Sequence, residues 1–204
     1  STESSDSVDG SSTDSSSSVD DGSLHEHTDE NEDGKCDACG DPIKATLEFF
    51  AINDLHGKFM DTDDNCGVDE MTTYLRNKQA QNPNVVLLSS GDMWQGSSES
   101  NLTHGNIITE WMNDLQFASM TLGNHEYDWG EEYIEQNATL AEFPVLGINV
   151  FDPDTNERET YAQPSVTIEK SGVKIGIIGA IGDCYSSIAS DKKEDVYFKT
   201  GDQL

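Results

Sequence analysis

Residues 121–130 read TLGNHEYDWG, a stretch that joins an apolar run to a cluster of polar side chains. Asparagine is a poor strand former and a histidine is costly to bury, so a simple turn would need neither. Asp128 follows His125 by three residues, which puts an acid within reach of the imidazole. The stretch is therefore either a turn or a chemical site, and the surrounding chain has to decide between them.

The chain around this stretch alternates strand-like and helix-like segments. The expected strands are residues 46–53, 85–90, 117–122 and 143–150, and the expected helices are residues 68–79, 107–115 and 131–141. Residues 165–170 and 173–182 flank Ser171-Gly172, a two-residue turn signal that predicts a hairpin. Strands that alternate with helices predict an α/β fold, and the hairpin makes its sheets mixed.

Three polar clusters each follow one of the predicted strands. They are Asn53–Gly57, Ser90–Asp92 and Gly123–Glu126. The carboxyl ends of strands are where open α/β sheets build their sites. If the strands are parallel neighbours, the three clusters meet at one edge of the sheet.

These clusters supply the ligands of a metal site. Asp54 and His56 alternate around Leu55, so an extended chain points both the same way. Asp92 can bridge two cations, and Asn124 can bind through its amide oxygen without adding charge. Such a mixed oxygen and nitrogen set suits divalent zinc, manganese, iron or cobalt. Two such ions would clamp a phosphate and activate a water molecule.

His125 and Asp128 then have a role as a catalytic pair. A histidine beside the metals could protonate the leaving oxygen, and the acid could orient its ring. Each motif alone is compatible with an ordinary loop, and only the three together favour a site. Glu126 is expected to be structural, His104 to be exposed, and Trp94 and Trp129 to be either packing residues or walls of the site.

The sequence motifs that carry a family resemblance are spread along most of the chain. They are NDLHG (53–57), SSGDMWQGS (89–97), TLGNHEYDWG (121–130), FPVLGINV (143–150) and GVKIGIIGAIG (172–182). Together they resemble the calcineurin-like metallophosphoesterases over about residues 45–190. Within that superfamily they are most similar to the bacterial 5'-nucleotidase and UDP-sugar hydrolase branch.

This resemblance implies a two-sheet β-sandwich flanked by helices and a dinuclear metal centre. It implies that Asp54, His56 and Asp92 hold one metal, and that Asp92 and Asn124 contribute to the other. It also implies that a metal-activated water hydrolyses phosphate esters, most simply 5'-nucleotides, UDP-sugars or 2',3'-cyclic nucleotides. His125 and Asp128 would again be the catalytic pair.

The chain departs from the family pattern after His125. The family completes its centre with later histidines and has a C-terminal domain that binds the nucleoside, but no histidine follows His125 here. We therefore expect residues 45–204 to be the N-terminal part of a larger phosphoesterase domain. This departure predicts weak binding of the second metal and leaves open whether this part alone is active.

Acidic residues dominate the composition, with 40 Asp and Glu against 11 Lys and Arg and a net charge of −29. This balance argues against a nucleic-acid polymer or an anionic membrane as partner. No run is apolar enough to cross a bilayer. Residues 1–23 are rich in serine and aspartate and predict a disordered linker, as on exported bacterial proteins at or beyond the cell surface. A non-catalytic exported metal-binding or attachment module is the competing interpretation.

Residues 24–44 form a small segment rich in Cys, His and Asp. His25, His27, Cys36 and Cys39 give an HxH pair followed by CxxC, which can bind zinc tetrahedrally. The same segment follows a calcium-loop spacing at Asp29, Asn31, Asp33 and Asp37, but Gly40 stands where the last acid is needed. Disulfides, Cys36 with Cys39 or Cys66 with Cys184, are further alternatives.

Overall fold

The computed structural model describes residues 28, 30, 35–40, 45–61, 66–182, 184–192 and 196–204. The chain divides into two compact units, Ser1–Ile43 and Lys44–Leu204. The predicted linker, residues 1–23, lies outside the described residues. None of the helices in the described ranges is long and apolar enough to span a membrane.

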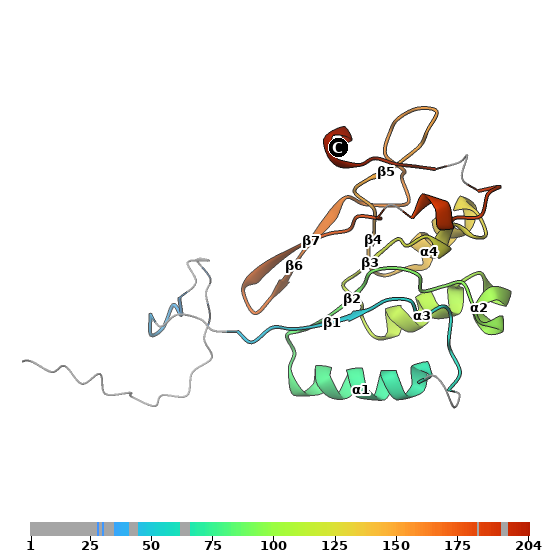
Figure 1. Cartoon of the computed structure of the whole chain (residues 1–204). Helices are drawn as coiled ribbons and strands as arrows, with labels where there is room; N and C mark the ends of the chain where they lie inside the picture. Colours follow the sequence, from blue (N-terminus) through green and yellow to red (C-terminus); the bar gives the residue numbers. More distant parts are fainter. Residues whose placement is uncertain are drawn as a thin grey trace, which may run out of the picture. The chain divides into compact units, whose positions relative to one another are not determined.

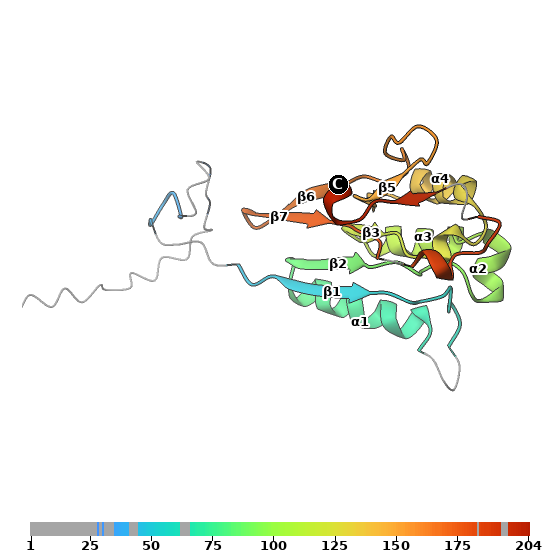
Figure 2. The same cartoon turned by 45° about the horizontal axis from the view of Figure 1, so that its top comes forward.

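A parallel sheet forms the centre of the second unit (Figure 1). Its strands are β1 (Glu48–Ile52), β2 (Val85–Ser89), β3 (Ser119–Thr121) and β4 (Val145–Leu146), in the order β1-β2-β3-β4. Figure 2 shows β1 and β2 side by side and pointing the same way. β2 reads VVLLS and is almost wholly buried, as expected for a strand covered on both faces. The predicted α/β fold is confirmed.

Four helices accompany this sheet. They are α1 (Val68–Gln81), α2 (Ser98–Thr103), α3 (Asn106–Asp114) and α4 (Glu131–Leu140). Three of them were expected, whereas α2 is too short and too polar to show a hydrophobic stripe. Its start is marked instead by Ser97, whose side chain accepts a hydrogen bond from the N–H of Ser100.

The strands outside the parallel sheet form two antiparallel pairs among the described residues. β6 (Ser165–Lys170) and β7 (Val173–Ile178) make the predicted hairpin, and β5 (Val150–Phe151) pairs with β8 (Tyr197–Phe198). Ser171 and Gly172 both have positive φ, at 47° and 75°, as the tight turn of a hairpin requires. The expected strand over 143–150 is broken into β4 and β5.

The core joins the sheet to α3 and α4. Met120, Ile108, Met112 and Ile134 are completely buried there. Trp94 is 1% exposed and is therefore a packing residue. The prediction of an exposed His104 is wrong, because its half-buried ring stacks on Tyr133 at 4.0 Å between centroids.

Candidate metal centre

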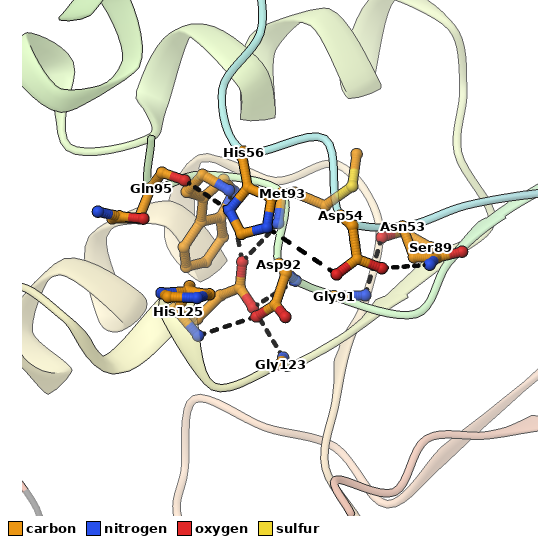
Figure 3. Close-up of polar contacts among 12 residues, drawn as sticks. Asn53, Asp54, His56, Ser89, Gly91, Asp92, Met93, Gln95, Gly123 and His125 are labelled. Atoms are coloured by element: carbon orange, nitrogen blue, oxygen red, sulfur yellow. Dashed lines mark hydrogen bonds and ion pairs between the residues drawn. The ribbon is translucent and has the colours of Figure 1, made fainter. Parts of the chain in front are cut away.

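The loops after β1, β2 and β3 meet at the carboxyl edge of the sheet. The N–H of Asp54 donates to the carbonyl of Gly91 at 3.1 Å, and the N–H of His56 donates to that of Asp92 at 3.0 Å. The N–H of His125 donates to Oδ1 of Asp92 at 2.8 Å, which brings in the third loop. The expected convergence of the three polar clusters is confirmed, and Figure 3 shows their side chains gathered there.

His56, Asp92 and His125 form a group that could hold a metal ion. Each offers one ligand atom within 4.8 Å of those of the other two. Asp54 adjoins this group, with Oδ1 3.9 Å from Nε2 of His56. Nδ1 of His56 lies 3.0 Å from the carbonyl of Gln95, which fixes the proton on Nδ1 and leaves Nε2 for a cation. The donor set therefore fits a divalent transition metal.

The backbone at these positions is unusual. Asp54, His56 and Asp92 have positive φ values of 54°, 50° and 55°, a region that non-glycine residues seldom adopt. Such conformations persist where the surrounding structure holds them, and they cluster at functional sites. Here the hydrogen bonds between the loops after β1 and β2 hold them, and buried Leu55 anchors the first loop.

Asn124 lies between two anchored residues. Gly123 donates its N–H to the carboxylate of Glu126 at 2.7 Å, and His125 donates its N–H to Asp92. These bonds hold the main chain of Asn124 beside Asp92 at the start of a short 3-10 helix, η1 (His125–Tyr127). The assignment of its amide as a metal ligand stays a prediction.

The pair of His125 and Asp128 forms across η1. Nδ1 of His125 lies 2.7 Å from Oδ2 of Asp128. Burial lowers the pKa of the imidazole, but the hydrogen bond and charge of Asp128, with the charges of Asp92 and Glu126, outweigh it and raise the pKa. Because Asp128 binds Nδ1 of His125, only Nε2 of that ring is left to interact with a group in the site. The centroids of the His56 and His125 rings lie 4.9 Å apart.

Glu126 has the structural role expected of it from the sequence. Its side chain is fully buried, and its two carboxylate oxygens accept four backbone N–H groups. The donors are Asp92, Met93, Trp94 and Gly123. Burial raises the pKa of Glu126 to about 7, while these donors favour the ionised form. Glu126 thus fastens the loop after β2 to the loop after β3.

Gly91 gives a prediction on the packing of these loops. It has φ of +101°, and a Cβ there would lie 2.4 Å from the N atom of Gly123. We expect Gly91→Ala to lower the free energy of unfolding by about 2–4 kcal/mol, because both backbone strain and a backbone clash oppose it. Chemical denaturation measures this loss.

Gly172→Ala is the matched control for Gly91→Ala. Gly172 also has positive φ, +75°, but nothing lies within 4 Å of the added Cβ. Gly172→Ala should therefore lower the free energy of unfolding only by the backbone strain, about 1–2 kcal/mol. Equal losses for the two variants would contradict the close packing of Gly91 on Gly123.

The small Cys/His-rich segment is described only in part. Cys36 is buried and Cys39 exposed, whereas His25 and His27 lie outside the described residues. The disulfides considered from the sequence, Cys36 with Cys39 or Cys66 with Cys184, stay predictions.

Comparison with known proteins identifies the family. The family model described as "Calcineurin-like phosphoesterase" matches residues 47–195, which include all of the loops described above. The chain belongs to the calcineurin-like phosphoesterase family. The resemblance found in the motifs is confirmed.

The relatives of this phosphoesterase domain are much longer proteins. The chain is 30% identical over 158 residues to an apyrase of Tabanus yao, covering 72% of this chain and 28% of the relative. It is 34% identical over 138 residues to a 5'-nucleotidase of Vibrio parahaemolyticus, covering 65% of this chain and 24% of the relative. It is 31% identical over 149 residues to the protein UshA of Yersinia enterocolitica, covering 71% of this chain and 27% of the relative. The chain therefore spans about a quarter of these relatives' length.

Solved structures support the same fold. The NAD nucleotidase of Haemophilus influenzae superposes with a TM-score of 0.65 and 25% identity, covering 76% of this chain and 29% of that one. The calcineurin-like phosphoesterase YfkN of Bacillus subtilis superposes with a TM-score of 0.62 and 26% identity, covering 75% of this chain and 54% of that one.

Proposed function

We propose that this chain carries the metal-binding part of a hydrolase that cleaves phosphate esters, with 5'-nucleotides or related nucleotides as substrates. The gathering of Asp54, His56, Asp92 and His125 where the three strand-end loops meet carries the proposal. The relatives named 5'-nucleotidase support the choice of nucleotides. The share of these relatives that the chain covers fits a substrate-binding part outside residues 45–204.

Two divalent ions, of zinc, manganese, iron or cobalt, are the proposed cofactors. Asp54, His56 and Asp92 would hold one ion, and Asp92 and Asn124 would contribute to the other. When bound, such ions supply an activated water and neutralise the charge of the phosphate. Asp54 and Asp92 would otherwise repel an anionic substrate, so we expect catalysis to depend strictly on metal.

His125 and Asp128 are the proposed catalytic pair. Asp128 holds the imidazole through Nδ1, and this leaves Nε2 to carry a proton at the side facing His56 and Asp92. The hydrogen bond and charge of Asp128 raise the pKa of His125, which favours the protonated ring that this role needs. His125 would deliver it to the leaving oxygen of the ester, while Asp128 stabilises the charged ring.

The proposed location is extracellular or at the surface of a bacterial cell. The Ser/Asp-rich residues 1–23 and the net charge of −29 support a solvated, exported protein. A small-molecule phosphoester is the proposed partner at the site.

Hydrolysis by His125 variants of the complete protein tests the proposal. AMP, UDP-glucose and a 2',3'-cyclic nucleotide are offered with and without added Mn²⁺. We expect AMP to be cleaved only with metal, and His125→Gln to lower kcat by about 10²- to 10⁴-fold, as for a general acid.

His104→Gln provides the matched control, because the His104 ring stacks on Tyr133 and is not one of the proposed metal-binding or catalytic residues. Its kcat should stay near that of the wild type. Preference for the cyclic nucleotide would favour a phosphodiesterase of the same family. Absence of turnover in protein that holds metal would favour the non-catalytic module and overturn the proposal.

A further inference from the structure

A backbone peptide group fixes the orientation of the His56 ring. Nδ1 of His56 lies 3.0 Å from the carbonyl oxygen of Gln95, and Figure 3 shows the two groups facing each other. A carbonyl oxygen only accepts hydrogen bonds, so this contact requires the ring proton to be on Nδ1. Nε2 then carries the lone pair that a metal ion would need. The position of the Gln95 carbonyl therefore decides which nitrogen of His56 is available to a metal.

Asn101 holds the same peptide group from its other side. The carbonyl of Gln95 and the N–H of Gly96 belong to one planar peptide group, and this N–H donates to Oδ1 of Asn101 at 3.0 Å. The side-chain amide of Asn101 also donates to the carbonyl of Gly96 at 3.3 Å. Hydrogen bonds linked in a chain polarise one another, so the bond to Asn101 makes the Gln95 carbonyl a better acceptor for His56.

The short helix α2 brings Asn101 back to this peptide group. The N–H of Asn101 donates to the carbonyl of Ser97, the cap of the helix, at 2.9 Å. The N–H of Ser97 in turn donates to the carbonyl of His56 at 3.0 Å, and its hydroxyl donates to the carbonyl of Gly57. These bonds join the start of α2 to the loop that carries His56. A six-residue helix with little apolar surface thus presses one segment of backbone against the His56 ring.

We propose that Asn101 is a positioning residue for His56, which it orients through the peptide group of Gln95 and Gly96. The inference rests on the proposed function, in which His56 binds a metal ion. Asn101 touches neither metal nor substrate in this role, because it acts by keeping the proton on Nδ1. Outer hydrogen-bond partners of metal-bound histidines commonly change metal affinity by about 10- to 100-fold. Asn101 acts one bond further out, so we expect its loss to cost about 3- to 10-fold.

Asn113 offers a matched control for a purely structural role of Asn101. Oδ1 of Asn113 accepts the N–H of Glu142 at 2.7 Å, and its amide donates to the carbonyl of Leu140 at 2.9 Å. The side chain therefore makes the same pair of bonds to the backbone as Asn101 does. Neither partner belongs to the three loops of the candidate metal centre. Asn113→Ala removes an equivalent pair of hydrogen bonds but should leave His56 unaffected.

Nitrogen NMR of the His56 ring in the metal-free complete protein tests the proposal first. Spectra are recorded at about pH 8.5, where an unperturbed imidazole is neutral, and His56→Gln identifies the signals of His56. We expect the wild type to show a protonated Nδ1 and an unprotonated Nε2. Asn101→Ala should move a large part of the ring population to the tautomer protonated on Nε2, whereas Asn113→Ala should give the wild-type spectrum.

Calorimetric titration with Mn²⁺ tests the consequence for the metal centre. Mn²⁺ favours oxygen ligands over thiolates, so the cysteines of the chain contribute little. Asn101→Ala should weaken binding by about 3- to 10-fold, and Asn113→Ala should bind like the wild type. Asn101→Asp is the milder variant to be used if Asn101→Ala does not fold. It keeps an acceptor for the Gly96 N–H but loses the donor, so its tautomer shift in the NMR experiment should be smaller.

The outcomes separate a failure of this inference from a failure of the proposed function. A wild-type ring protonated on Nε2, or a tautomer that stays unchanged in both Asn101 variants, would overturn the positioning role. Equal tautomer shifts in Asn101→Ala and Asn113→Ala would overturn it too. A shift that is specific to Asn101 but leaves Mn²⁺ affinity unchanged, or occurs in protein that binds no Mn²⁺, would confirm that Asn101 orients the ring. It would instead refute His56 as a metal ligand.

Discussion

Glu126→Gln is expected to lower the free energy of unfolding by about 3–5 kcal/mol, although it changes only one atom of the side chain. Oε1 of Glu126 accepts the N–H groups of Met93 and Trp94, and Oε2 accepts those of Asp92 and Gly123. Whichever way the amide turns, its NH₂ group faces two N–H donors that lose their acceptor in a fully buried place. Urea denaturation near neutral pH measures the loss.

Glu135→Gln is the matched control for this prediction. Glu135 is exposed on α4, so the same chemical change should alter stability by less than about 0.5 kcal/mol. A loss below about 1 kcal/mol for Glu126→Gln would mean that the loops after β2 and β3 hold together without this carboxylate. The bracing role of Glu126 would then be wrong.

Asp92→Asn is expected to weaken metal binding by more than about 100-fold, since loss of even an outer partner of a ligand costs 10- to 100-fold. The asparagine keeps the shape of the side chain and an oxygen that can accept the N–H of His125. It loses one negative charge and the ability to bridge two cations. We therefore expect the fold to survive and the metal to be lost, as titration calorimetry with Mn²⁺ or Zn²⁺ would measure.

Asp114→Asn separates this effect from a general loss of charge. Asp114 forms an exposed ion pair with Arg76 and is not one of the proposed metal ligands, and such pairs contribute at most about 1 kcal/mol. Its metal affinity should equal that of the wild type. If Asp92→Asn binds as tightly as Asp114→Asn, Asp92 is not a ligand.

Much of the fold could be predicted because apolar periodicity reflects burial directly. The buried run of β2 and the stripe of α1 both stand out in the sequence, and Asn82 and Pro83 mark the end of that helix. α2 could not be predicted in this way, because it has six residues and begins at a serine cap. The break between β4 and β5 was also missed, although Gly147 and Asn149, residue types that are common in turns, stand inside the apolar run 143–150.

The sequence predicted those site residues that directly follow a strand. Three parallel strands place their carboxyl ends together, so Asp54, Asp92 and His125 could be expected at one edge. The contribution of Glu126 depends on which backbone N–H groups surround it, and this is a property of the packed loops and not of their spacing. The signal available was an acid directly after a predicted catalytic histidine, in a stretch that is otherwise turn-like.

The burial of His104 could not be predicted from the sequence. A histidine just before a helix suggested an exposed residue, but its ring stacks on Tyr133 and meets Trp129 edge-on at 5.4 Å. Both aromatic residues come from the segment that follows the GNHE motif. Contacts between segments distant in sequence decided its burial, and no local pattern could supply them.

Metal content is the measurement that tests the central claim most directly. The protein is prepared with both Cys36→Ser and Cys39→Ser, so that only the strand-end centre is counted, and its bound transition metal is determined by elemental analysis with and without Asp92→Asn. We predict that the double-serine protein retains metal and that Asp92→Asn removes it. A double-serine protein without metal, or one whose metal is unaffected by Asp92→Asn, would contradict a metal centre built from these three loops.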